Sequence, residues 1–285
     1  MAEIDIDSLF LDTGRHSRPE VGMNVLEAVS ATTPGEKFGD KPRTVSPVIA
    51  NMLRVWNEEL EDEPRQELKR YIKKVANSLL TDDVEEHRAW RATDWLVRVQ
   101  APAWLKAAGV EDLAEELENQ EPIWTPDNAR ATQPILDAAH ETLNRQAKEG
   151  ADAWGRKGEE AWAEVSPKKW ESVSNGIHSA VRNATRRGHI AALAAAEATG
   201  KRYAARDAAF EIACDVGWDA AFTMAWKVAL PRGAGEAGET STAVRDALEP
   251  TASHLHKLTF ELLDQLLDTR RLPDEVMRDV DIVGS

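Results

Sequence analysis

The stretch of sequence that decides the fold is residues 202–229, which reads RYAA RDAA FEIA CDVG WDAA FTMA WKVA. Alanine or glycine stands at the fourth place of every unit, and three of the seven units also have alanine at the third place. A repeat of four indicates a helix, because an α-helix turns once in 3.6 residues whereas a strand repeats every two. We therefore expect a helix over residues 202–229. Pro231 should stop it, since proline lacks the N–H that a continuing helix needs.

This helix is expected to form the centre of the fold. Four residues turn a helix through about 400°, so the alanine stripe winds slowly around the helix axis and lets a second helix approach closely. Large apolar side chains point away from the axis in several directions: Tyr203, Phe210, Trp218, Phe222 and Trp226. Other helices should therefore surround it. A cofactor site or partner groove along the same stripe is the alternative.

Proline and glycine divide the rest of the chain into further helices. A proline that follows Ser or Asp/Glu predicts helix starts at Pro47, Pro64 and Pro167, and Gly109 predicts an end. The expected helices include residues 19–30, 64–80, 82–108 (kinked or divided at Pro102), 111–118, 134–148 (ended by Gly150), 167–187 and 251–270. Nothing alternates with period two for long enough to give a sheet. The sequence therefore predicts an all-α protein, a multi-helix bundle or irregular helical array around the helix at 202–229.

A change of composition at residues 119–128, which contain Pro122 and Pro126, predicts a linker. We expect an amino-terminal helical region with a loop-rich start over residues 1–120, and an Ala- and Trp-rich helical region over residues 121–285. The two could also pack as one domain.

The net charge is −15, from 50 acidic and 35 basic residues. Direct binding to nucleic acid is not expected, because neutralising phosphates requires a basic face. The single cysteine, Cys214, cannot form an intramolecular disulfide, which favours a reducing, cytoplasmic location. Acidic residues near the start argue against a secretion signal, and no apolar stretch approaches the roughly 20 residues of a membrane span.

Familiar catalytic motifs are absent. The sequence has no Gly-rich phosphate loop, no His-Glu-x-x-His, no pair of cysteines and no Gly-x-Ser-x-Gly. The nearest match to a di-iron helix motif is Asp137 followed by His140, a single copy with the shorter acid, and this pattern is more typical of an exposed helix face. We predict no metal and no cofactor.

One amino-terminal group contains residue types that suit acid–base chemistry or a hard metal ion: Asp12, His16, Glu27, Glu36 and Asp40. The candidate catalytic residues are His16, Glu27 and Asp40. Their spacing in the sequence does not bring them together, and a polar lead-in segment would have the same composition.

Positive charge concentrates in one place, where Arg182, Arg186, Arg187 and Arg202 could bind a phosphate or an acidic peptide. Salt bridges to neighbouring carboxylates explain this cluster equally well.

A second charged group, Arg91, Asp94 and Arg98, forms an i, i+3, i+7 ladder beside tryptophans. It could line a pocket. An ion pair that organises a helix junction is the more common role of such a ladder.

Several short motifs resemble an uncharacterised family of Ala- and Trp-rich helical proteins from actinobacteria and their phages: residues 14–16, 22–29, 40–42, 46–49, 56–57, 94–96, and the Trp-Asp-Ala-Ala unit at 218–221. The resemblance covers most of the chain and implies no function. It implies that relatives carry Cys in place of Asn24 and His in place of Lys41, so that a soft-metal set would be depleted here.

We therefore predict a non-catalytic binding or regulatory protein that acts on a macromolecular partner, in a phage–host or regulatory setting. The partner would be a protein, or a second copy of this chain, and no membrane would be involved. Most of the ten tryptophans should be core anchors. An exposed apolar patch with several of them would support partner binding, and the absence of such a patch would count heavily against it. The main alternative is a helical enzyme with a pocket built from His16, Glu27 and Asp40, to which Arg91, Asp94 and Arg98 could also belong. Convergence of His16 and Glu27 within hydrogen-bonding reach would favour this enzyme. A weaker alternative is an acidic mimic of nucleic acid.

Overall fold

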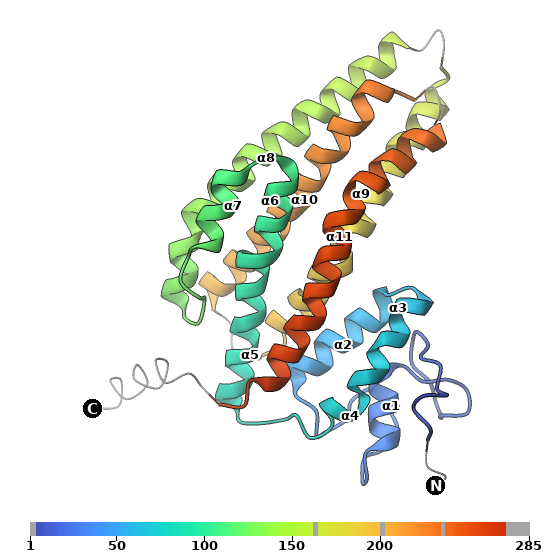
Figure 1. The fold of residues 1–285 in the computed structure, drawn as a ribbon, viewed down its shortest axis with the longest axis vertical. Coiled ribbons are helices and arrows are strands. Elements are labelled where there is room, and N and C mark those ends of the chain that lie inside the picture. The colour runs from blue at the N-terminus through green and yellow to red at the C-terminus, as the bar shows by residue number, and fades with distance from the viewer. Residues whose placement is uncertain (1–3, 162–164, 200–202, 235–236, 272–285) are drawn as a thin grey trace. The chain divides into compact units, whose positions relative to one another are not determined.

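The protein is all-α, as the sequence predicts (Figure 1). The computed structural model describes residues 4–161, 165–199, 203–234 and 237–271. Within these ranges there is no strand, and extended backbone pairs only at an isolated bridge between Leu11 and Met23. None of the helices described is both long enough and apolar enough to cross a membrane.

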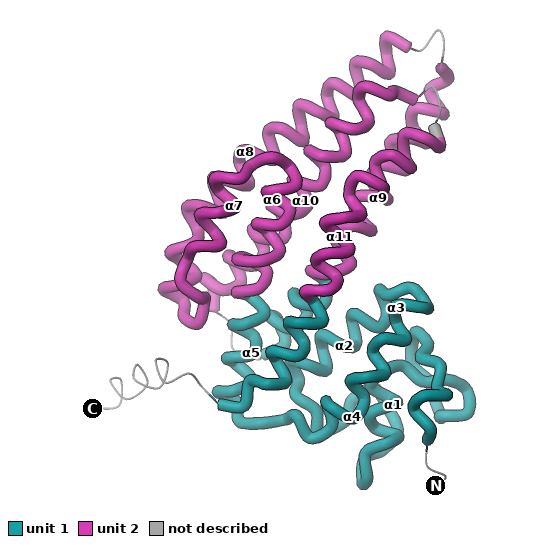
Figure 2. The backbone as a smooth tube through the Cα atoms, viewed as in Figure 1, with its two compact units in different colours: residues 1–93, 190–202, 259–285 teal, residues 94–189, 203–258 magenta. Residues whose placement is uncertain are grey.

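The chain forms two compact units, coloured separately in Figure 2. Unit 1 contains residues 1–93, 190–202 and 259–285, and unit 2 contains residues 94–189 and 203–258. These boundaries differ from the expected division at residue 120, and the expected linker at 119–128 lies within unit 2. Each unit combines segments that are distant in the sequence, which a local change of composition does not reveal.

The amino-terminal part of unit 1 described by the structure contains α1 (Val25–Thr32), α2 (Pro47–Glu59), α3 (Asp62–Gln66), the 3₁₀ helix η1 (Glu67–Tyr71), α4 (Ile72–Val75) and most of α5 (Asp82–Trp95). The ends of two later helices, at residues 190–196 and 259–268, complete its described helices. The start at Pro47 is confirmed, because the Ile49 N–H donates to Ser46 Oγ at 3.2 Å and Ser46 caps the helix. Two other expected boundaries were wrong. The helix expected at 19–30 begins only at Val25, and the one expected at 64–80 is broken into α3, η1 and α4.

Phe260 anchors the core of unit 1. It belongs to α11 (Ala237–Asp268), and its ring lies 4.4 Å from the Trp56 ring of α2 and 6.0 Å from the Tyr71 ring. The Arg70 guanidinium stacks over the same ring at 4.2 Å. One aromatic side chain from late in the sequence thus joins two early helices.

A buried ion pair closes the end of α11. Arg88 and Glu85 are both almost fully buried and meet at 2.7 Å. Arg88 also donates to the carbonyls of Leu266, at 2.9 Å, and Thr269, at 3.0 Å. Because the last carbonyls of a helix have no partner inside it, Arg88 serves as their cap.

The described residues of unit 2 contain five complete helical segments and most of two more: the π-helical segment η2 (Leu96–Gln100), α6 (Ala101–Ala108), α7 (Glu111–Glu118), α8 (Pro126–Glu160) and α10 (Ala204–Arg232), with most of α9 (Pro167–Ala196) and α11. The helix at 111–118 is confirmed, as is the end at Gly109, which is left-handed with φ of 81°. The helix expected at 82–108 is interrupted close to Pro102. A five-residue π-helical segment, Leu96–Gln100, lies directly before α6, the helix that contains the proline.

The helix expected at 134–148 is much longer than expected. It begins at Pro126, behind the Thr125 cap, and continues through Gly150 to Glu160. Gly150 does not end it, because that glycine serves close packing: a Cβ there would lie 2.7 Å from Cβ of Trp226 on α10. Similarly, α9 continues past Gly188, and α11 begins at Ala237 and not at residue 251.

The helix expected at 202–229 is α10, and it packs against α8 and α6. Arg202 itself lies outside the described residues. The fourth residue of every sequence unit but the first forms the buried stripe: Ala209, Ala213, Gly217, Ala221, Ala225 and Ala229. Pro231 does not stop the helix, which ends one residue later at Arg232. Proline removes only one N–H from the last turn, and Gly233, with φ of 68°, ends the helix by donating to the Ala229 carbonyl at 2.9 Å.

Most tryptophans are core anchors. Of the nine tryptophans in the described residues, seven are buried: Trp56, Trp90, Trp95, Trp104, Trp154, Trp170 and Trp226. The other two, Trp124 and Trp218, are partly exposed. The described part of the chain therefore presents no patch of exposed tryptophans.

Candidate functional site

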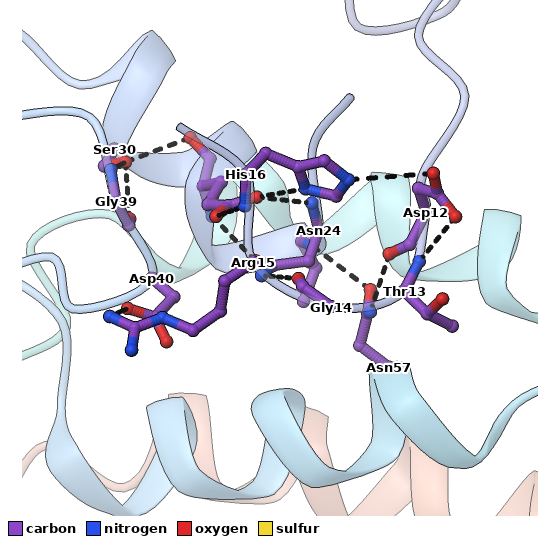
Figure 3. A network of polar contacts seen from close by, with 12 residues as sticks. Asp12, Thr13, Gly14, Arg15, His16, Asn24, Ser30, Gly39, Asp40 and Asn57 are labelled. Atoms are coloured by element: carbon purple, nitrogen blue, oxygen red, sulfur yellow. Dashed lines mark hydrogen bonds and ion pairs between the residues drawn. The ribbon is translucent and has the colours of Figure 1, made fainter. Parts of the chain in front are cut away.

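The structure brings His16 and Glu27 together in unit 1 (Figure 3). The ring Nδ1 of His16 lies 2.8 Å from Oε2 of Glu27, and the backbone N–H of His16 donates to Oε1 at 2.7 Å. The side chain of Glu27 is 1% exposed and that of His16 is 11% exposed. The two residues thus form a buried pair, which the sequence could suggest but not locate.

Glu27 holds this place because it completes the start of α1. The Asn24 side chain accepts from the Glu27 N–H at 3.0 Å, and Glu27 Oε2 accepts from the Asn24 N–H at 3.0 Å. This reciprocal arrangement is a capping box, recognisable as Asn-x-x-Glu in the sequence. The Asn24 side chain also donates to the Gly14 carbonyl at 2.7 Å, which fixes the loop that carries His16.

A second carboxylate and a glycine border the other side of the His16 ring. Oδ2 of Asp12 lies 3.6 Å from Nε2, and the Asp12 side chain is half exposed. Gly22, with φ of 155°, lies so close that a Cβ there would be 2.8 Å from Nε2. The ring therefore fills the space between the loop at Asp12 and the turn at Gly22.

Asp40 belongs to a different part of the network. Its carboxylate accepts from Arg15 at 2.9 Å (Figure 3). It also lies 3.9 Å from Nε of Arg54. Asp40 is buried, whereas the Arg15 side chain is exposed. Glu36, also in the candidate group, accepts from the Thr44 N–H at 3.0 Å. The sequence candidates thus divide among three sets of contacts, those of His16 with Glu27, of Asp40 and of Glu36.

The chemistry open to the His16–Glu27 pair is narrow. The Glu27 carboxylate accepts three hydrogen bonds, from two backbone N–H groups and one ring, out of roughly four acceptor positions. The helix cap and the loop at His16 therefore use most of the hydrogen-bonding capacity of this carboxylate. Across the described residues, no group of three or more His, Cys, Asp or Glu side chains is placed to hold a metal ion.

The basic cluster is only partly described. Arg187 donates to Oε1 of Glu249 at 2.7 Å, with both side chains partly exposed. Burial of Glu249 acts to raise the pKa of that carboxyl, but hydrogen bonds from Ser253 and Arg187 outweigh it and lower the pKa. Arg182 is exposed and Arg186 is partly exposed on the same helix, while Arg202 lies outside the described residues.

The ladder at 91–98 has two separate roles. Within unit 2, Nη1 of Arg98 lies 3.2 Å from Oδ1 of Asp94, which also accepts from the Ile123 N–H at 2.9 Å. This contact is an ion pair at a helix junction, which is the role that the sequence analysis gave as the more common one for such a ladder. Arg91 instead donates to the Gln265 side chain in unit 1, at 3.0 Å.

Sequence reasoning missed the pairing of His140. The residue was interpreted as part of an exposed face, but its Nδ1 lies 3.2 Å from Oδ2 of Asp219, which joins α8 to α10. Burial raises the pKa of the Asp219 carboxyl, and His140 partly opposes that shift. Because the partner is 79 residues away, no local signal could have revealed this pair.

Comparison with known proteins identifies no relative. No family model, no curated protein and no solved structure matches this chain. The resemblance to an actinobacterial and phage family therefore remains a prediction, and the function has to be argued from the chain itself.

Proposed function

We propose that this protein is a non-catalytic binding protein that acts on a protein partner with a basic surface. The observation that carries the proposal is that Glu27 is buried and already hydrogen-bonded. The sequence offered one acid–base group for an enzyme, and its central carboxylate is buried and occupied by the cap of α1 and by His16. The distance between His16 and Glu27 is short enough for an acid–base pair of an enzyme. The contacts of Glu27, however, hold the loop at His16 to the start of α1, and we call this arrangement the structural clasp.

The charge distribution supports a basic partner. The chain carries a net charge of −15, and α7 contributes five exposed carboxylates: Glu111, Asp112, Glu115, Glu116 and Glu118. Among the described residues, only Glu118 of these has a cationic partner, Lys106 at 2.7 Å. The apolar residues Ala114 and Leu117 are buried, and α7 packs against α6 and α8. The helix thus presents a firmly held acidic face, which would attract and orient a positively charged protein surface.

The burial of the tryptophans bears on which kind of contact would hold such a partner. Seven of the nine described tryptophans are in the core, so aromatic side chains give no support to this proposal. The proposed association therefore has electrostatic attraction as its physical basis. Association through exposed charges should be strongly salt-dependent.

The test is affinity capture with the full chain as bait, from an extract of the cells that encode it, followed by mass spectrometry. One variant converts Glu111, Asp112, Glu115 and Glu116 to the corresponding amides. A matched control converts four exposed acids of α8 in the same way: Glu141, Asp152, Glu159 and Glu160. Both variants lose four negative charges.

The proposal expects a partner that the native chain and the α8 control retain, that the α7 variant loses, and that elutes as the salt concentration rises. Equal retention by both variants would exclude the α7 face. Turnover of any metabolite by the purified native chain, abolished in Glu27→Gln, would contradict the non-catalytic assignment.

A further inference from the structure

A cavity of about 470 Å³ lies in unit 1 beside the carboxyl-terminal end of α11. Its volume falls in the range of roughly 300–1,000 Å³ that is typical of small-molecule sites. The α5 residues His87 and Arg91 line one part of it, and residues from the end of α11 line the rest: Gln265, Asp268, Thr269, Arg270 and Arg271. None of the candidate residues of the His16–Glu27 network borders it.

The lining is unusually basic for so acidic a protein. It contains three guanidinium groups, those of Arg91, Arg270 and Arg271, and a single carboxylate, that of Asp268. Arg91 is held by Gln265 at 3.0 Å, which orders its side chain at the wall of the cavity. Arg270 and Arg271 are exposed and make no ion pair with another described residue.

These arginines are not needed to close the end of α11. Buried Arg88 already donates to the carbonyls of Leu266 and Thr269 and pairs with Glu85. Positive charge at this helix end therefore exceeds what capping requires, and Arg270 contributes to a lowered pKa of Arg88, for which burial is the main cause.

His87 adds a neutral hydrogen-bonding group to the cavity. The residue is buried, and burial, assisted by the charge of Arg91, lowers its pKa to about 4. At neutral pH the ring is uncharged, so one nitrogen can donate and the other can accept. The cavity thus combines fixed positive charge with a neutral polar group on its buried side.

We propose that this cavity binds a small phosphorylated molecule, with the phosphate held by Arg91, Arg270 and Arg271. Guanidinium groups bind phosphate oxygens through paired, charge-assisted hydrogen bonds, and three of them around one cavity suit a doubly charged oxyanion better than a single carboxylate. The cavity has room for more than the phosphate group, and His87 lies on its buried side. This site is independent of the proposed acidic face on α7.

The experiment is isothermal titration calorimetry of the full chain with inorganic phosphate, pyrophosphate and citrate, at pH 7.5 and constant ionic strength. The test variant is Arg270→Gln with Arg271→Gln, because both side chains are exposed and their replacement leaves the core intact. The matched control, Arg145→Gln with Arg156→Gln, removes two exposed arginines of α8.

The expected result is saturable binding of one pyrophosphate per chain, weaker binding of phosphate, and affinity reduced at least tenfold in the test variant but unchanged in the control. No saturable binding of pyrophosphate to the native chain would overturn the proposal. Equal weakening in both variants, or binding of citrate without pyrophosphate, would overturn it as well.

Discussion

Glu27 receives two hydrogen bonds from one residue, the backbone N–H of His16 at 2.7 Å and its ring Nδ1 at 2.8 Å. The same carboxylate closes the first turn of α1 through the Asn24 N–H. A loop residue and a helix start are therefore held by a single buried side chain. The contact links local helix capping to the placement of the amino-terminal loop.

Replacing Glu27 with Gln should destabilise the protein by about 1–3 kcal/mol, because an amide NH₂ would face donors that the carboxylate now satisfies. The free energy of unfolding in urea, followed by circular dichroism, measures the change. Glu20→Gln is the control, since Glu20 is exposed and should change the stability by less than about 0.5 kcal/mol. Equal stability of the two variants would mean that the clasp contributes little.

Gly217→Ala should destabilise the protein by about 1–3 kcal/mol through overpacking. A Cβ at Gly217 on α10 would overlap the buried Gln100 amide and lie 3.2 Å from Cδ1 of Trp104. Thermal and urea unfolding measure the effect. The control is Gly155→Ala in α8, where nothing lies within 4 Å of the new Cβ, and alanine should stabilise that helix by about 0.5–1 kcal/mol. The same sign for both changes would contradict an enclosed α10.

His87 should make stability depend on pH. Its pKa is about 4 in the folded protein, where burial and Arg91 disfavour the charged ring, against an ordinary 6.5. The unfolded chain then binds more protons between these values, so stability is complete above about pH 6.5 and falls by up to about 3 kcal/mol as the pH drops to 4. Urea unfolding across this range should show a shallower decline for His87→Gln, whereas His254→Gln, at an exposed position, should retain the native profile. Parallel profiles for all three proteins would refute the assignment.

Arg88→Met should cost about 3–5 kcal/mol, because it leaves the buried Glu85 carboxylate without its cation and the end of α11 without its cap. Adding Glu85→Gln should recover part of this loss, since the uncompensated buried charge is then removed. Unfolding in urea gives both values, and a double variant less stable than Arg88→Met alone would contradict this interpretation of the pair.

The parts of the fold that the sequence predicted are those with local causes. The four-residue repeat located α10, Ser46 marked the start of α2, and the left-handed Gly109 marked the end of α6. Errors arose where a distant contact decides the outcome. Gly150 looks like a helix end, but Trp226 of α10 explains why a residue without a side chain is needed in mid-helix.

The candidate site shows the same limit. The Asn-x-x-Glu capping box is local and could have placed Glu27 at the first turn of α1. The approach of His16 depends on the turn at Gly22, and the basic cavity depends on the packing of α5 beside the end of α11. The residue types were enough to select His16 and Arg91 as candidate site residues. Which side chains lie beside each of them depends on how the helices pack.

The most direct test of the central claim is hydrogen exchange at the backbone amides of His16 and Asn24, which both donate to Glu27. Two-dimensional NMR of the native chain and of Glu27→Gln, at the same pH and temperature, resolves these amides individually. A structural clasp predicts slow exchange of both amides in the native chain, at least tenfold faster exchange in Glu27→Gln, and unchanged exchange in α10. Exchange of the two native amides at the rate of an unprotected chain would contradict the clasp and return Glu27 to the residues available for catalysis.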